Sequence, residues 1–252
     1  MTENILGIRV DPTSYMATTH QIAIWAKAGE SRYVCVANVH MIMEAFDDPH
    51  FKDIVNAADL VTPDGMPLVW ILRHQGFTNQ TRVYGPDLTL EIIAAVATDK
   101  IPIGFYGGTS DALDAMIRIF KSKYPALNVV YAYSPPFRPL TIDEDADVVN
   151  RIKQSGTRIL FVGLGCPRQE RWMAAHKGQI SSVMLGVGAA FDFHAGSKRQ
   201  APKWMQVVGL EWLFRFTQEP QRLWRRYLIY NSRFIILILK QLLRRENDKG
   251  QR

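Results

Sequence analysis

The stretch Arg158–Trp172, RILFVGLGCPRQERW, combines an apolar strand, a glycine turn and the start of a helix. After Arg158 the next four residues are apolar, as expected for a strand inside a sheet. Gly163 and Gly165 follow where the chain must turn, and Pro167 suits the first turn of a helix. A strand that leads through a tight turn into a helix is the repeating unit of α/β proteins.

The same pattern recurs on both sides of this stretch. Short apolar runs predict further strands, at 32–37, 58–61, 101–106, 128–132 and 182–187. Amphipathic runs between them predict helices, including 88–97, 110–123 and 142–154. The alternation predicts an α/β fold with a Rossmann-like, mostly parallel sheet and flanking helices. Ligands of such folds bind where the strands end and the loops begin.

The composition changes near residue 196. The segment from Lys198 to Arg252 carries 13 of the 30 Lys and Arg residues but only 4 of the 24 Asp and Glu residues. Aromatic residues lie among these basic residues, and Pro220 marks the expected start of a helix. The apolar run Phe234–Leu239 is shorter than the roughly 20 residues needed to span a bilayer.

We therefore predict an α/β core at 1–196 and a helical appendage at 197–252. A basic helix with an apolar, aromatic face can lie in the interface of an anionic membrane. Packing over the core or at a subunit interface is the alternative, and a homo-oligomer is left open. The cysteines, Cys35 and Cys166, lack metal-ligand companions, which indicates a reducing compartment. Because the N-terminus has no signal-peptide pattern, we expect a cytoplasmic protein.

The loop Val61–Pro67, VTPDGMP, places Asp64 between two prolines directly after a predicted strand. A rigid loop can hold a carboxylate at a fixed angle toward a cleft, as a general base requires. The alternative is a turn aspartate that caps the helix starting near Pro67.

The segment Gly163–Trp172 opens a helix, so its backbone amides and Arg168 form a candidate cradle for an anion or a nucleotide. Arg168 stands where a dinucleotide fingerprint has its third glycine, and the GK[ST] of a P-loop is absent. A tight turn without a ligand explains the spacing equally well.

A second glycine pair, Gly186 and Gly188, follows the strand predicted at 182–187 and permits close approach of a ligand to the backbone. Asp192 and His194 lie just beyond it. We interpret them as a hydrogen-bonded structural pair rather than as site residues.

Three arginines of the appendage, Arg215, Arg222 and Arg225, are candidates for binding an anionic ligand. Guanidinium groups match the geometry of phosphate oxygens and offset their charge. Binding of lipid headgroups, or a solvated helix face, is the alternative.

Taken together, the sequence resembles the WecG/TagA/CpsF family, glycosyltransferase family 26. The resemblance covers roughly Arg32 to Arg226. It rests on seven motifs in order: ANVH with Asn38, ADLVTPDGMPLVW, RVYGPDL, GFYGGT, ILFVGLGCPRQERWM, GVGAAFDFHAG and RQAPKWMQVVGLEWLFRFTQEPQRLWRRY.

The resemblance implies an inverting, metal-independent hexosyltransferase of the EC 2.4.1 type. Such an enzyme moves a hexose or N-acetylhexosamine from a UDP-sugar donor to an undecaprenyl-diphosphate-linked sugar. The products are exopolysaccharide, capsule, common antigen or teichoic acid linkage units. The resemblance also implies a GT-E-type fold whose appendage completes the site. That appendage would hold the protein, as a peripheral protein, on the anionic inner face of the cytoplasmic membrane.

The resemblance also assigns residues. Asp64 is the expected base, Asn38 lies in the substrate pocket, and Arg168, Gln169 and Glu170 form its nucleotide side. The remaining expected binding residues are the arginines Arg215, Arg222 and Arg225 and the strand-end glycines Gly107, Gly163, Gly165 and Gly188. Ala37 departs from the family, whose members often have a threonine near the pocket asparagine, and this bears on the choice of sugar donor.

The acidic run Asp143–Asp147 contains two DxD patterns, which hold a divalent metal in many glycosyltransferases. Thr141 and Glu144 form a capping signature beside it, so we interpret the run as a solvated start of a helix. The six histidines show no zinc spacing. No metal and no other cofactor is expected.

Two other classes of protein were weighed. A nucleotide-dependent dehydrogenase or epimerase fits the α/β pattern but requires the absent GxGxxG. A non-enzymatic basic protein that binds membrane or nucleic acid fits the appendage. The basic residues alternate with Trp and Leu at helical spacing, which favours a lipid surface, so no nucleic-acid partner is expected.

Overall fold

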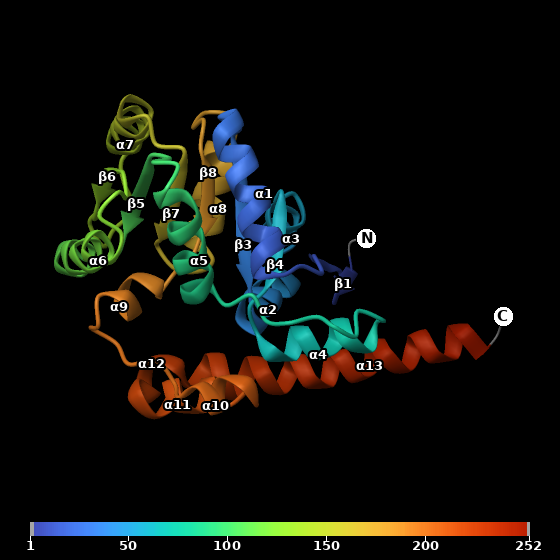
Figure 1. Ribbon diagram of the computed structural model, residues 1–252. Helices are drawn as coiled ribbons and strands as arrows, with labels where there is room; N and C mark the ends of the chain where they lie inside the picture. Colours follow the sequence, from blue (N-terminus) through green and yellow to red (C-terminus); the bar gives the residue numbers. More distant parts are fainter. Residues whose placement is uncertain (1–2, 251–252) are drawn as a thin grey trace.

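A computed structural model describes residues 3–250 of the chain, with side chains for 4–244 (Figure 1). Its centre is a six-stranded sheet in the order β4-β3-β8-β7-β5-β6, and every neighbouring pair is parallel. The strands are β3 (Arg32–Ala37), β4 (Leu60–Pro63), β5 (Ile103–Gly107), β6 (Val129–Tyr133), β7 (Ile159–Gly163) and β8 (Val183–Gly186). The predicted α/β fold with a parallel sheet is confirmed. Each strand lies within two residues of its predicted bounds.

Helices cover both faces of the sheet. One buried apolar cluster joins the sheet to α1 (Tyr15–Ala28), α5 (Gly85–Ala97), α6 (Ser110–Lys123) and α9 (Ala190–His194). A second cluster joins its other face to α2 (Val39–Asp47), α3 (Pro49–Asn56), α4 (Met66–His74), α7 (Ile142–Ser155) and α8 (Arg168–His176). A short antiparallel hairpin, β1 (Glu3–Ile5) and β2 (Ile8–Val10), packs into the second cluster and was not predicted.

The appendage is a series of helices that crosses the carboxyl ends of the strands (Figure 1). It consists of α10 (Lys203–Val207), α11 (Glu211–Gln218), α12 (Pro220–Trp224), the π-helix η1 (Arg225–Tyr230) and α13 (Asn231–Gly250). Within the described residues, no helix is long and apolar enough to cross a bilayer. The predicted division of the chain after residue 196 stays a prediction.

The first half of the last helix is tied to the core. Phe234 and Ile238 of α13 are buried in the second apolar cluster. Arg233 makes two bonds of 2.7 Å to the carboxylate of Asp47 at the end of α2. Gln241 accepts a hydrogen bond of 2.9 Å from the backbone of Leu6, in the turn of the hairpin. The appendage is therefore packed firmly onto the core, where it covers the carboxyl end of the sheet.

Two glycines let β5 and β7 approach each other at the end of the sheet. Gly107 lies opposite Gly163 and has a φ of 122°, a conformation that L side chains rarely adopt. A Cβ atom at Gly107 would lie 2.5 Å from the carbonyl carbon of Gly163. This close approach brings the two strand ends, and the loops that follow them, side by side.

We expect Gly107→Ala to destabilise the protein by about 3 kcal/mol or more, since neither the backbone nor the added methyl group can be accommodated. Chemical denaturation of the purified variant measures the change. Gly178→Ala is the matched control, because Gly178 also has a positive φ but its Cβ would meet no atom within 4 Å. Equal losses in the two variants would show that backbone strain alone, rather than the contact with Gly163, determines the effect.

Candidate active site

A cavity of about 1330 Å³ lies between the carboxyl ends of the strands and the appendage. Loops that follow all six strands contribute to its wall, and α11, α12 and η1 of the appendage complete it. The position agrees with the general rule for α/β folds. A smaller cavity of about 100 Å³ adjoins it, between α4 and the appendage, and shares residues such as Asp64 and Arg226 with it.

Ten of the twelve predicted site residues line the large cavity: Asn38, Asp64, Gly163, Gly165, Arg168, Gln169, Gly188, Arg215, Arg222 and Arg225. The other two, Gly107 and Glu170, do not line it. Gly107 serves the packing of β5 against β7, and Glu170 is fully buried beneath the wall. Substrate binding by the ten lining residues stays a prediction.

Asp64 follows β4 directly and is held by both backbone and side-chain contacts. Its backbone N–H donates to the carbonyl of Ala37 over 2.8 Å, and the guanidinium of Arg82 donates to its Oδ1 over 3.0 Å. The side chain is 14% exposed. Burial raises the pKa of the Asp64 carboxyl, while the positive charge of Arg82 acts in the opposite direction. The helix-cap alternative is wrong, because α4 begins after Gly65 and receives no side-chain cap.

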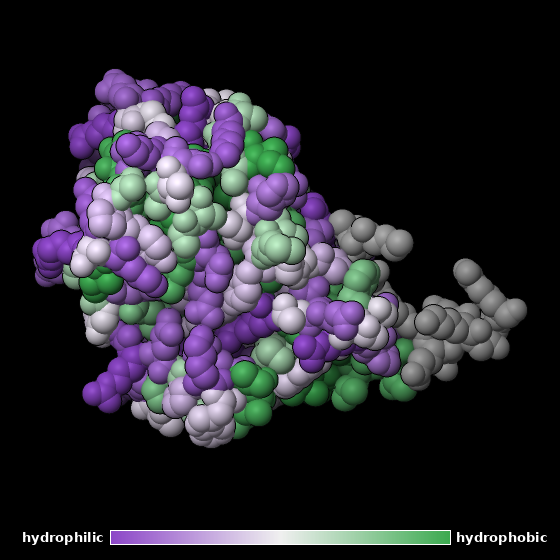
Figure 2. Space-filling model, in the orientation of Figure 1, coloured by the Kyte–Doolittle hydropathy of each residue, from purple (hydrophilic) through white to green (hydrophobic). Residues whose placement is uncertain are grey.

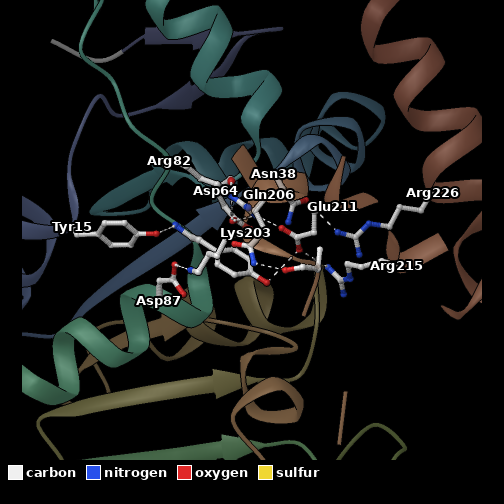
Figure 3. Close-up of polar contacts among 12 residues, drawn as sticks. Tyr15, Asn38, Asp64, Arg82, Asp87, Lys203, Gln206, Glu211, Arg215 and Arg226 are labelled. Atoms are coloured by element: carbon white, nitrogen blue, oxygen red, sulfur yellow. Dashed lines mark hydrogen bonds and ion pairs between the residues drawn. The ribbon is translucent and has the colours of Figure 1, made fainter. Parts of the chain in front are cut away.

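Arg82 lies between Asp64 and a second carboxylate (Figure 3). Its Nη2 is 2.7 Å from Oε2 of Glu211, the first residue of α11. The hydroxyl of Tyr84 donates to the other oxygen of Glu211 over 3.3 Å, and the guanidinium of Arg82 lies over the Tyr84 ring at 4.0 Å. Sequence reasoning assigned no role to these three residues, although they belong to the quoted motifs RVYGPDL and GLEWLFRF.

Arg226 of η1 is a fourth residue to which sequence reasoning assigned no role. Its Nη2 lies 3.5 Å from Oδ1 of Asn38, the residue that caps α2, and its Nε is buried without a hydrogen-bond partner. Within the described part of the chain, no carboxylate forms an ion pair with it, and burial lowers its pKa. Burial, followed by the charge of Arg226, also lowers the pKa of His40 to about 3. A largely buried cation without a carboxylate partner at the wall of a cavity favours the binding of an anion there.

The predicted arginines occupy two different environments. Arg215 is 19% exposed on its side chain, lies 4.0 Å from Glu211 and stacks over the ring of Phe193 at 5.5 Å. Arg222 and Arg225 are exposed at the rim, where Arg222 forms an ion pair with Glu219. The cavity therefore has an inner pair of arginines, Arg215 and Arg226, and an outer pair, Arg222 and Arg225.

Gln169 and Glu170 form a connected pair at the start of α8. Gln169 accepts a hydrogen bond of 3.1 Å from the backbone of Gly165 and donates one of 2.7 Å to Glu170. Glu170 has no exposed surface, and burial raises its pKa to about 7. Glu170 therefore fixes the orientation of Gln169, whose side chain reaches the cavity wall.

Replacing Glu170 with Gln should stabilise the protein at pH above 7. The native carboxyl holds its proton up to about pH 7, whereas the unfolded one loses it near pH 4.5. Stability falls as pH rises through this window, by up to about 3 kcal/mol, and the neutral amide removes that loss. Urea unfolding from pH 5 to 8.5 measures it, with the exposed Glu91→Gln as control. A difference between wild type and Glu170→Gln that does not grow with pH would contradict this account.

The interpretation of Asp192 and His194 as a bonded pair is wrong. Asp192 forms an ion pair of 3.1 Å with Lys198, and Nε2 of His194 lies 3.0 Å from the carbonyl oxygen of Pro86. Two residues apart on the short helix α9, they point in different directions. The acidic residue therefore lies at the cavity wall and the histidine beneath α5.

The interpretation of the DxD run as a helix start is confirmed. Thr141 and Glu144 form a complete capping box at the start of α7. Asp145 accepts hydrogen bonds of 2.9 Å from Trp172 and from Nε2 of His176. Among the residues that the structure describes, no group of three or more His, Cys, Asp and Glu side chains is arranged to hold a metal ion.

A parallel α/β sheet with a cavity at its carboxyl edge, lined by the largely buried carboxylate of Asp64 and several arginines, is the arrangement expected of a protein that binds an anionic ligand. Comparison with protein families identifies the class more closely. The model of the glycosyl transferase WecG/TagA/CpsF family matches residues 3–248. The chain therefore belongs to the WecG/TagA/CpsF family of glycosyltransferases.

Curated relatives are similar over nearly their whole length. A protein of Bacillus subtilis is 26% identical over 239 residues, covering 94% of this chain and 90% of its own. Proteins of Bacillus spizizenii, 25% identical over 232 residues, and Staphylococcus aureus, 26% identical over 225, cover 88% and 87% of their own chains. Each carries the name N-acetylglucosaminyldiphosphoundecaprenol N-acetyl-beta-D-mannosaminyltransferase.

Proposed function

We propose that the protein transfers a hexose or N-acetylhexosamine, with inversion, from a UDP-sugar to a sugar on undecaprenyl diphosphate. The products would be intermediates of a cell-surface polysaccharide. One observation carries the proposal: a single cavity combines a buried carboxylate, Asp64, with the inner arginines Arg215 and Arg226. The carboxylate suits proton transfer and the arginines suit a diphosphate.

The proposed reaction is a single displacement. The Asp64 carboxylate takes the proton from an acceptor hydroxyl, and that oxygen attacks the anomeric carbon from the face opposite the diphosphate. The bond between the anomeric carbon and the diphosphate oxygen breaks, and UDP leaves with the electron pair. Arg215 and Arg226 offset the charge that develops on the leaving group, and a metal ion is not required in this scheme.

The environment of Asp64 supports its assignment as the base. A carboxylate that acts as a general base must be ionised at the working pH and must also bind a proton well. Its pKa should therefore lie above that of an ordinary carboxyl and not far from the working pH. Burial raises the pKa of Asp64, which makes its carboxylate a stronger base. The positive charge of Arg82 opposes this rise and favours the ionised form. The pH at which activity is half-maximal on the acid side should therefore lie above the usual range for an aspartate.

A panel of UDP-sugars tests the proposal. The named relatives make UDP-N-acetylmannosamine the first donor to try, with N-acetylglucosamine on undecaprenyl diphosphate as acceptor. Ala37, near the pocket Asn38, makes a broader panel of hexose donors worthwhile. We expect transfer from at least one donor and equal rates with and without EDTA. Loss of transfer in EDTA would overturn the metal-free scheme, and no transfer from any donor would overturn the UDP-sugar assignment.

We also propose that the appendage lies on the anionic inner surface of the cytoplasmic membrane. Apolar side chains gather on its outer face, where Figure 2 shows them in green along the lower edge of the molecule. The exposed large apolar or aromatic residues of the appendage include Trp204, Val207, Leu213, Trp224, Leu228, Ile235, Ile236, Leu239 and Leu243, each more than one-third exposed. The neighbouring basic residues add electrostatic attraction to anionic lipid.

Replacing Ile235 and Leu239 with Ser should weaken binding to anionic vesicles by at least about tenfold, since each side chain loses about 1 to 2 kcal/mol of transfer energy. Sedimentation with phosphatidylglycerol vesicles measures it. The control replaces Ile24 and Ile119, which are also about half exposed but lie on α1 and α6. Equal losses in both double variants, or tighter binding to an oligonucleotide than to vesicles, would contradict the membrane assignment.

A further inference from the structure

One guanidinium group lies between two carboxylates at the junction of the core and the appendage. Arg82 Nη2 is 3.0 Å from Oδ1 of Asp64 and 2.7 Å from Oε2 of Glu211. The three side chains are 12% to 16% exposed, so solvent screens their charges only weakly. A single cation beside two carboxylates leaves a net negative charge in the cluster.

The two carboxylates come from different parts of the fold (Figure 3). Asp64 and Arg82 belong to the core, whereas Glu211 is the first residue of α11 and reaches the cluster because the appendage is packed there. The hydroxyl of Tyr84 donates to Oε1 of Glu211 and fixes its second oxygen. With the appendage absent, Asp64 would have Arg82 to itself.

We propose that Glu211 is a positioning residue for the transfer reaction: it draws Arg82 partly away from Asp64 and thereby makes Asp64 a stronger base. The inference rests on the proposed role of Asp64 as base. A carboxylate with a full share of a guanidinium is a stable anion and takes up a proton poorly. Nε of Arg82 donates to Asp64 over a long 3.3 Å, and the closer Nη2 serves both carboxylates, so Asp64 has only part of that stabilisation.

The other groups that face Asp64 leave this effect in place. Beyond Arg82 they are Glu211 and Arg215 from α11, Tyr15 from α1, Tyr84 and, from η1, Arg226. The negative charge of Glu211 raises the pKa of Asp64, and the positive charge of Arg215 lowers it more weakly. Burial raises the pKa values of both tyrosines above the usual range, so they remain neutral. Glu211 is therefore the only carboxylate among these groups in the described residues.

The consequence is that the position of the appendage and the basicity of Asp64 are coupled. The appendage brings Arg215 and Arg226 to the cavity, and in the same contact it brings Glu211 to Arg82. Asp64 therefore becomes fully competent only when the arginines for the leaving group are also present.

The test is the pH dependence of kcat in wild type and Glu211→Gln. The amide keeps the shape and the hydrogen bond with Tyr84 but removes the charge. We expect the acid limb of the profile to move to lower pH by about half a unit to one unit, because Asp64 then ionises more easily. The plateau should fall severalfold, because the base is weaker, with little change in the KM for the donor. An acid limb that stays in place or moves to higher pH would overturn the inference.

Two further variants separate the charge from the packing. Glu211→Asp retains the charge and should keep the acid limb near that of wild type. Asp47→Asn loosens the appendage at its exposed contact with Arg233 and should leave the limb unchanged. If Asp47→Asn shifts the limb as Glu211→Gln does, loose docking is the cause and the inference fails.

Separate controls test whether the variant folds and whether the proposed transfer activity exists at all. If circular dichroism shows that Glu211→Gln is unfolded, Glu211→Ala takes its place with the same expected shift. An inactive wild-type protein would overturn the proposed function, whereas an active wild type with an unshifted variant would overturn only the role of Glu211.

Discussion

Asp64→Asn is expected to lower kcat for sugar transfer by about 10²- to 10⁴-fold, the usual contribution of a general base. The amide matches the carboxylate in shape and can still accept a hydrogen bond from Arg82, but it cannot take a proton from the acceptor. Since Asp64 is not expected to touch the nucleotide, the affinity for UDP should change by less than about threefold. Initial rates with the lipid-linked acceptor and calorimetry with UDP measure the two quantities.

The matched control is Asp87→Asn. Asp87 lies at the start of α5, is tied to Lys203 of the appendage and does not line the cavity. Its replacement should leave the rate close to that of wild type. Full activity of Asp64→Asn would exclude Asp64 as the base. Equal losses in both variants would instead assign the effect to the seating of the appendage.

Arg226→Gln is expected to weaken UDP binding by about 10- to 100-fold, as for loss of a charged hydrogen bond in a desolvated site. Arg225→Gln should cost only a fewfold, because Arg225 is exposed at the rim and solvent screens its charge. The informative result is which variant loses more affinity for UDP, since only the structure distinguishes these adjacent arginines. Titration calorimetry with UDP at fixed salt measures both.

The stability of the same variants provides an independent check. Arg226 is a buried cation without a carboxylate partner in the described chain, so its replacement removes an unfavourable desolvation. The melting temperature of ligand-free Arg226→Gln should equal or exceed that of wild type, although the variant binds UDP less well. A strong loss of stability, or a larger binding effect for Arg225→Gln, would contradict an anion-binding role for Arg226.

Most of the sheet was predictable from the sequence because buried parallel strands are continuous apolar runs. The strand Arg32–Ala37 and the helix Ser110–Lys123 have the bounds predicted for them. The hairpin at residues 3–10 was not predicted, since its strands have three residues each and its turn is held by distant side chains of α3 and α13. Short elements that depend on distant contacts leave no period in the sequence.

The residues of the candidate site also fall into those that the sequence could predict and those that it could not. Asp64, Asn38 and the strand-end glycines follow predicted strands, so their position at the cavity follows from the topology. Arg82, Glu211 and Arg226 have roles that depend on contacts between residues 18 to 188 positions apart. Neither the composition nor the periodicity of a sequence can predict contacts between residues so far apart.

The adjacent residues Arg225 and Arg226 both line the cavity, but they differ in exposure for a specific reason. Helical spacing from Arg222 brings residues 225 and 226 almost equally close to the same face, and the family resemblance assigned Arg225 without distinguishing it from Arg226. The π-helix η1 widens the turn that begins at Arg225. Arg226 and Tyr227 then point inward, while Arg225 and Leu228 are exposed. Irregular helical turns of this kind are common at functional sites and are not visible in a 3.6-residue pattern.

The last helix has two apolar faces with separate duties. Phe234 and Ile238 are buried against the core, whereas Ile235 and Leu239 point to the outside. Residues one position apart thus determine two different properties, so the outer face can be redesigned without disturbing the inner one. A version with a polar outer face would be a reagent for assays in plain buffer with short-chain acceptors. It would also show how much of the turnover in cells depends on concentrating enzyme and acceptor in two dimensions.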